Sequence, residues 1–156
     1  MNIRDKIGNL ALNLDFNGNP VSFSYARKSE QNINADDLCF PNILFIEPDS
    51  FGFIPSIVSG TLKSYTNIFI QFTTRMPDSN EEHKDEISRD ANYRNAMIEE
   101  MRTLAAQFVQ KILSDDDFEN VINDMPMIPV IEAYDANVFG VELQIPKLIH
   151  AFPLPC

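Results

Sequence analysis

Cysteine, histidine and glycine are scarce in this sequence of 156 residues, with two, two and five copies respectively. Five scattered glycines cannot build a phosphate-binding loop, and the sequence has neither a Walker-type loop nor a His-Glu-x-x-His pattern. Cys39 and Cys156 lie far apart, so they form neither a Cys-x-x-Cys metal pair nor a disulfide framework. We therefore expect no nucleotide chemistry and a reducing compartment.

Basic residues are also few, since 12 Lys and Arg stand against 23 Asp and Glu and give a formal net charge of -11. Such a surface repels nucleic acid, which argues against DNA binding through a positive patch. An acidic channel wall would still let DNA pass without sticking to it, provided that several subunits form a ring. No apolar run approaches the length of a membrane span, and Met1–Leu14 lacks the apolar core of a signal peptide. We expect a soluble, unexported chain with no membrane contact.

The length predicts one compact domain. Hydrophobic residues make up 44% of the chain and charged residues 22%, as in ordinary globular proteins. We place the domain at residues 1–146. Residues 147–156, which are punctuated by proline, form a C-terminal tail that could dock on a neighbouring subunit.

Hydrophobic periodicity predicts two helices. Apolar residues recur at helical spacing from Ile3 to Leu14, which predicts a short amphipathic helix over residues 2–14. A longer amphipathic stripe runs from Ile87 to Ile112 and ends at Ser114–Asp117.

Five segments combine apolar, β-branched and aromatic residues over strand-like lengths. They are Val21–Tyr25, Phe40–Ile46, Thr61–Thr74, Met127–Ile131 and Val138–Ile145. The third is apolar on both faces, so we expect it at the centre of the sheet. The fold class is therefore α+β, with a small mixed or antiparallel sheet of about five strands flanked by the short N-terminal helix and the long helix.

Asp49–Gly60 interrupts this pattern with glycine and proline among large apolar residues. It predicts an apolar-tipped loop or a hairpin excursion. The sequence leaves open whether this segment packs in the core or contacts another subunit.

The stretch Met76–Asp90 is the most charged part of the chain, and it contains His83. His83 and Glu86 are three residues apart, so one helical face offers two metal ligands, which do not make a site. Ser79 and Glu82 instead fit a capping box, with further carboxylates at the positive end of the helix dipole. We expect the charged start of a helix and no metal ion.

Other chemical motifs are weak. His83 and His150 lie outside any nucleophile–base pattern, and Asp115–Asp117 lacks the alternating ligands of a calcium loop. Aromatic rings could in principle stack on bases, but they lack interleaved basic residues, so we expect them to pack in the core. These rings are Phe16, Phe23, Tyr25, Phe69 and Phe72. We expect no catalytic residue, no metal and no cofactor.

Three segments form a recognisable order: Tyr25–Asn32 leading to Phe40-Pro41, then Ile68–Phe72 feeding a helix that ends in Ala105–Phe108, then Tyr134–Leu143. Together they resemble small virion proteins of tailed phages and prophages of Bacteroides-type bacteria. The pattern is similar to tail-terminator and head-tail neck proteins.

The resemblance implies a non-enzymatic subunit of a homo-oligomeric ring at the neck or at the end of the tail tube, assembled in the host cytoplasm and retained in the virion. Its partners would be other copies of itself, neighbouring connector or tail proteins, and DNA that passes without specific binding. We expect subunit contacts at Phe51, Phe53, Ile54, Ile57, Leu148, Phe152 and Leu154. We expect an acidic face, toward the lumen or toward solvent, at Glu81, Glu82, Asp85 and Glu86.

Two other hypotheses stay open. The chain could be a monomeric phage-encoded adaptor or chaperone that binds another protein without enzymatic activity. A metal-dependent hydrolase using His83 and Glu86 is the remaining alternative.

Overall fold

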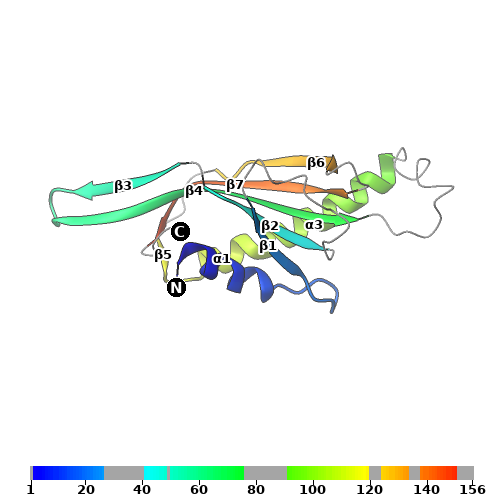
Figure 1. Cartoon of the computed structure of the whole chain (residues 1–156), viewed down its shortest axis with the longest axis horizontal. Helices are drawn as coiled ribbons and strands as arrows, with labels where there is room; N and C mark the ends of the chain where they lie inside the picture. The colour runs from blue at the N-terminus through cyan, green and yellow to red at the C-terminus, as the bar shows by residue number, and fades with distance from the viewer. Residues whose placement is uncertain are drawn as a thin grey trace.

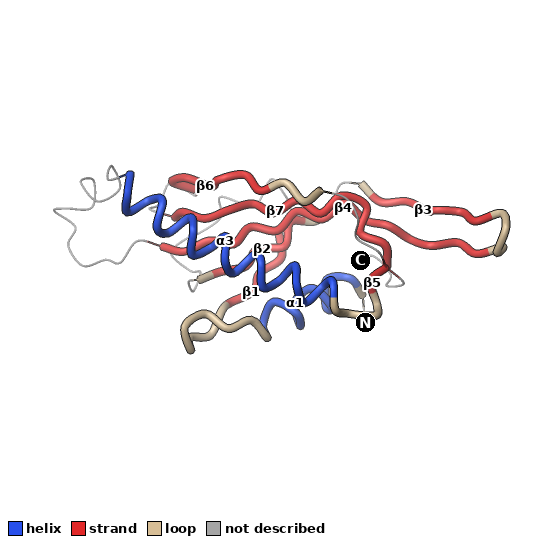
Figure 2. The backbone as a smooth tube through the Cα atoms, turned by 180° about the vertical axis from the view of Figure 1, so that it is seen from behind, coloured by secondary structure: helices blue, strands red, loops and turns tan. Residues whose placement is uncertain are grey.

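The structure is a computed structural model that describes residues 2–26, 41–48, 50–75, 91–119, 124–133 and 138–150, with the backbone alone at 91–93 and 131–133. Within these residues, a mixed sheet of seven strands carries two helices on one face (Figures 1 and 2). The elements are α1 (Ile3–Leu12), β1 (Ser22–Ala26), β2 (Asn42–Ile46), β3 (Phe51–Ser56), β4 (Thr61–Arg75), α3 (Ala91–Leu113), β5 (Phe118–Glu119), β6 (Met127–Ala133) and β7 (Val138–His150). The expected α+β class is confirmed, with seven described strands in place of about five.

Strand β4 is the centre of the sheet, as its apolar sequence predicts. The strands follow the order β1-β2-β4-β7-β5, while β3 also pairs with β4 and β6 also pairs with β7. Only β1 and β2 run parallel; the other described pairs are antiparallel. The 15 residues of β4 extend past the end of β2, and β3 takes the place of β2 along the first part of the strand.

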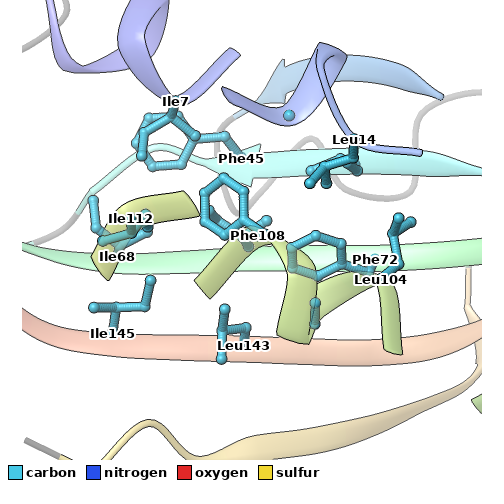
Figure 3. Close-up of a cluster of buried hydrophobic side chains, with 14 of the residues drawn as sticks. Ile7, Leu14, Phe45, Ile68, Phe72, Leu104, Phe108, Ile112, Leu143 and Ile145 are labelled. Atoms are coloured by element: carbon cyan, nitrogen blue, oxygen red, sulfur yellow. The ribbon is translucent and has the colours of Figure 1, made fainter. Parts of the chain in front are cut away.

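The core lies between the sheet and the helices (Figure 3). Alternate residues of β4 face the helices, and Ile68, Ile70 and Phe72 on this face are fully buried. Helix α3 presents its apolar stripe to them, and the ring of Phe108 meets that of Phe72 edge to face at 5.6 Å. From Ile98 to Ile112, the helical stripe predicted from the sequence is therefore the stripe that α3 buries. The start of the predicted stripe, at Ile87, lies outside the described residues.

Helix α1 begins with a capping box. The Asn2 side chain accepts a hydrogen bond from the Asp5 N–H, and the Asp5 carboxylate accepts one from the Asn2 N–H. Its buried face then packs on β1, where Gly8 leaves room for the ring of Phe23. A Cβ atom at Gly8 would lie 2.9 Å from this ring.

Gly140 in β7 lies against the backbone of β4, and its partner in the ladder is Thr73. A Cβ atom at Gly140 would lie 1.9 Å from the carbonyl oxygen of Phe72, so only glycine fits there.

Strand β7 continues beyond the end that the sequence predicts. The register of the β4–β7 ladder shifts between Thr66 and Ile68, and the extra residue in β7 forms a bulge around Lys147, which has a φ of 51°. Residues 147–150, expected to begin the tail, therefore belong to the sheet. Leu148 is fully buried in the core of its own chain, so the expectation that it forms a subunit contact is corrected.

Candidate functional site

Strand β3 and the first part of β4 form a hairpin that projects from the body of the molecule (Figures 1 and 2). This hairpin, Ser50–Asn67, is called the arm below. Its strands pair from Phe51 opposite Thr66 to Ser56 opposite Thr61, and the chain turns between them. Gly60 adopts a φ of 66° in this turn, a conformation that favours glycine. Of the two alternatives for Asp49–Gly60, the hairpin is therefore the one that forms over the described residues Ser50–Gly60.

Large apolar side chains on the arm are exposed. Phe51 and Phe53 expose 60% and 65% of their surface, and Leu62 on the opposite strand exposes 63%. At the tip, Ile57 is 98% exposed. Four of the expected contact residues, Phe51, Phe53, Ile54 and Ile57, therefore lie on one projecting element and are open to contact.

The apolar face of the arm continues the core face of the sheet. Because side chains alternate along β4, Leu62 points to the same side as Ile68 and Ile70. Phe51 and Phe53 stand on that side too, since they pair with Thr66 and Ser64. In the body this face is covered by α1 and α3, but neither helix extends along the arm (Figure 1). The arm thus presents core-type residues without the layer that buries them elsewhere.

Charge is nearly absent from the arm. Lys63 is its single charged residue, and its ammonium group pairs with the carboxylate of Glu119 in β5. The rest of the chain has an excess of acidic residues. The arm is therefore a part of the molecule where two copies can approach without strong repulsion.

A polar hollow of about 330 Å³ lies at the root of the arm. Its lining residues are Leu62, Lys63, Ser64, Asp116, Asp117, Glu119, Ile149 and His150. At its edge the Thr66 hydroxyl and His150 Nε2 form a hydrogen bond of 2.6 Å. Thr66 is 0% and His150 4% exposed, so this hydroxyl is not an accessible nucleophile. The pair instead joins the arm to the end of β7.

An ion-pair cluster beside this hollow joins the two helical regions. Lys6 in α1 contacts Asp115 at 2.6 Å and Asp117 at 2.9 Å, just beyond the end of α3. These hydrogen bonds raise the pKa of Lys6 above its ordinary value of 10.5. Burial acts to raise the pKa of Asp115, but hydrogen bonds from Lys6 and from the Asp117 N–H outweigh it and hold this pKa below its ordinary value of 3.8.

Several expected site residues lie outside the described part of the chain. These are the acidic set Glu81, Glu82, Asp85 and Glu86, the ligand pair His83 and Glu86, and the apolar residues Phe152 and Leu154. Within the described ranges, no three His, Cys, Asp or Glu side chains gather as metal ligands. No described helix has the length and apolar character needed to cross a membrane.

The aromatic residues weighed as a base-stacking platform are mostly used for packing. Phe72 is fully buried, and Phe16, Phe23 and Tyr25 pack against the core. Tyr25 meets Phe45 edge to face at 5.4 Å, and the Arg4 guanidinium lies 4.6 Å from the Tyr25 ring centre.

The arm is thus the feature that stands out, because it combines projection from the body, exposed apolar side chains and almost no charge. Comparison of the chain with protein-family models, with curated proteins and with solved structures found no significant match.

Proposed function

We propose that the chain is a non-enzymatic structural subunit of a phage particle, which forms a homo-oligomeric ring at the head-tail neck or at the end of the tail tube and lines the path of the DNA. The observation that supports this proposal is the arm, whose apolar face lacks the helical cover of the body. Subunit contacts through Phe51 and Phe53 would provide that cover. Ile54, on the other face of the hairpin, and Ile57, at its tip, would extend the contact.

The size of the apolar surface supports a contact that uses the whole arm. An aromatic side chain offers roughly 150–250 Å² of surface, so Phe51 and Phe53 together leave about 250 Å² exposed. At ~25 cal/mol per Å², burying this area stabilises a complex by about 6 kcal/mol. Association costs about 4–15 kcal/mol in lost freedom of motion, which over most of this range exceeds the gain from the two aromatic side chains. The apolar residues at the tip and on β4 must also be buried.

The net charge agrees with a role beside DNA. A formal charge of -11 per copy gives a ring a strongly negative field, which disfavours adhesion of a polyanion. The same charge opposes assembly of the copies, and the arm, whose single charged residue is Lys63, would bring them together at the position where repulsion is weakest.

A second candidate function uses the same surface. A phage-encoded adaptor or chaperone would remain monomeric and bind its arm to a different protein, as exposed apolar patches commonly do. The two candidates differ in whether the purified chain associates with itself.

Light scattering of the purified full-length chain tests the proposal. We expect oligomers of a defined size for the natural chain, and a monomer of unchanged circular dichroism for the double variant Phe51→Ser, Phe53→Ser. A matched control, Leu12→Ser with Leu113→Ser, removes apolar side chains that are 56% and 58% exposed on the body, and should assemble normally.

A natural chain that stays monomeric at high concentration would contradict the ring and favour the adaptor. Imaging of intact particles then tests the placement, since ring subunits should be arranged around the DNA path. An adaptor should instead be missing from mature particles.

A further inference from the structure

Two strands of the sheet have a partner on one side only among the described residues and also expose large apolar residues. They are β3, with Phe51 and Phe53, and β6, with Ile128. Strand β3 lies on the β4 side of the central β4–β7 pair and β6 lies on the β7 side. They also lie toward opposite ends of the long axis (Figure 1). The sheet therefore offers two different edges that face opposite ways.

The hydrogen-bond pattern shows which backbone groups of β3 point outward. The Asn67 N–H donates to the Ser50 carbonyl at 3.0 Å, so these two residues form a hydrogen-bonded pair of the ladder. Such pairs alternate along an antiparallel ladder, so the main-chain groups of Phe51, Phe53 and Pro55 point away from β4. Pro55 has no backbone N–H, so it leaves no unpaired donor at this edge.

Strand β6 has the same arrangement. The Gln144 N–H donates to the Pro126 carbonyl at 2.9 Å, which makes these residues a hydrogen-bonded pair. The alternation then directs the main-chain groups of Met127 and Pro129 away from β7. A proline again occupies a position where its missing N–H breaks no bond within the chain.

The side chains of the outward-pointing residues share one face. Phe53 lies on the core face of the sheet, as shown above. Met127 lies on this face too, because it is paired with Leu143, which is buried against the helices. Joining the two edges would therefore continue the sheet with the helices of both copies on the same side.

Strand direction is compatible with this joint. Three successive antiparallel pairings, β3–β4, β4–β7 and β7–β6, make β3 and β6 of one copy run in opposite directions. A second copy in the same orientation, shifted sideways and along the strands, presents its β6 antiparallel to the β3 of the first. Neither Phe51–Ser56 nor Met127–Val130 contains a charged residue, so like charges do not oppose each other at the joint.

We infer that the outward edge of β3 in one copy pairs with the outward edge of β6 in the next, forming a sheet that continues from copy to copy. This inference rests on the proposed self-association and specifies its partner strands. A contact between two different edges is head-to-tail and leaves a free β3 and a free β6 at the ends of every oligomer until a ring closes. A β3–β3 contact would instead end at a dimer and leave β6 unused.

Cysteine cross-linking tests the pairing in the full-length chain after Cys39→Ser and Cys156→Ser. Directly opposite hydrogen-bonded residues have Cα atoms about 5.5 Å apart, within the range of about 4.4–6.8 Å that a disulfide spans. A mixture of Phe53→Cys and Met127→Cys chains should give disulfide-linked dimers, whereas neither variant alone should. A mixture of Phe51→Cys and Met127→Cys chains tests the register in which β3 is shifted by two residues, so that Phe51 lies opposite Met127.

Other outcomes would overturn the inference. Cross-linked dimers of Phe53→Cys alone would show a twofold β3–β3 contact. Hydrogen exchange of the natural chain gives an independent measurement, since the amides of Phe51, Phe53 and Met127 should slow at least tenfold on assembly. If light scattering shows oligomers but neither β3–β6 cross-links nor slowed amide exchange is found, the pairing is contradicted. The proposed ring would not be contradicted by that result. A monomer at every concentration would contradict both.

Discussion

The side-chain oxygen of Asn67 accepts a hydrogen bond of 2.9 Å from the backbone N–H of Lys147. The backbone N–H of the same asparagine donates to the carbonyl of Ser50. Asn67 thus binds the bulge of β7 through its side chain and the start of β3 through its backbone. This residue therefore links the root of the arm to β7.

Replacing Asn67 by Ala should lower the free energy of unfolding by about 1 kcal/mol, because the Lys147 N–H loses its protein acceptor. Urea unfolding followed by circular dichroism measures the change. Lys147→Gly is the matched control, since it keeps the N–H and relieves the φ of 51°, so stability should be equal or higher. A loss of stability in Lys147→Gly similar to that in Asn67→Ala would contradict this account of the bulge.

Gly140→Ala should destabilise the chain by about 3 kcal/mol or more, because the added methyl group would overlap the Phe72 carbonyl and separate β4 from β7. Thermal unfolding or a loss of soluble protein would report this effect. Gly18→Ala is the control, because its Cβ would meet no atom within 4 Å and would strain only a φ of 77°. The free energy of unfolding of Gly18→Ala should fall by only about 1 kcal/mol.

The ion pairs of Lys6 should make stability depend on pH in two windows. The pKa of Asp115 is lowered on folding, so its contribution is present above about pH 4 and is lost as pH falls through the folded pKa. The pKa of Lys6 is raised on folding, so its contribution to stability is present below pH 10.5 and is lost as pH rises through the folded pKa.

Lys6→Met, which keeps the aliphatic stem, should therefore be less stable than the natural chain by about 0.5–1 kcal/mol at pH 7. The difference should shrink toward zero at the acid end, where Asp115 is protonated, and again above the pKa of Lys6. Urea unfolding at a series of pH values measures it. Arg102→Met, which removes an exposed partner of Glu99, is the control and should show little change at any pH.

Phe108→Ala should cost about 3–5 kcal/mol, since the ring is fully buried between α3 and the sheet and its removal leaves a cavity. Leu113→Ala, in the last turn of the same helix, removes a side chain that is 58% exposed. The free energy of unfolding of Leu113→Ala should stay within about 0.5 kcal/mol of that of the natural chain. Equal effects of the two variants would contradict the placement of α3.

Assembly of the natural chain should become stronger as salt is added. Repulsion between copies with a formal charge of -11 is screened over about 10 Å at 0.1 M ionic strength, while apolar contacts on the arm are not weakened. Sedimentation or light scattering between low and moderate salt measures this trend. Dissociation on adding salt would indicate contacts made mainly by opposite charges.

Local pattern was enough to predict the elements that form the core. The stripe that includes Met101, Ala105 and Phe108 predicted α3, and the two-sided apolar pattern of Thr61–Thr74 predicted the central strand. Both signals come from neighbouring residues in the sequence, so they do not depend on the rest of the fold.

Features that depend on distant residues could not be predicted. Lys6 and Asp117 are 111 positions apart, so their ion pair has no local signal in the sequence. The predicted strand Val138–Ile145 was too short, because Asn67 stabilises a bulge that carries β7 on to His150. The arm had a partial signal in its glycines and apolar residues, yet only the register with β4 shows that its exposed face continues the core.

The continuity of β4 has a mechanical consequence. One strand forms both the arm and the centre of the body, where it is bonded to β2 on one side and β7 on the other. Tension applied along the arm would therefore load these two ladders in shear, with many hydrogen bonds resisting together instead of opening one by one. A neighbour that pulled on the arm would transmit force directly into the central strand of the sheet.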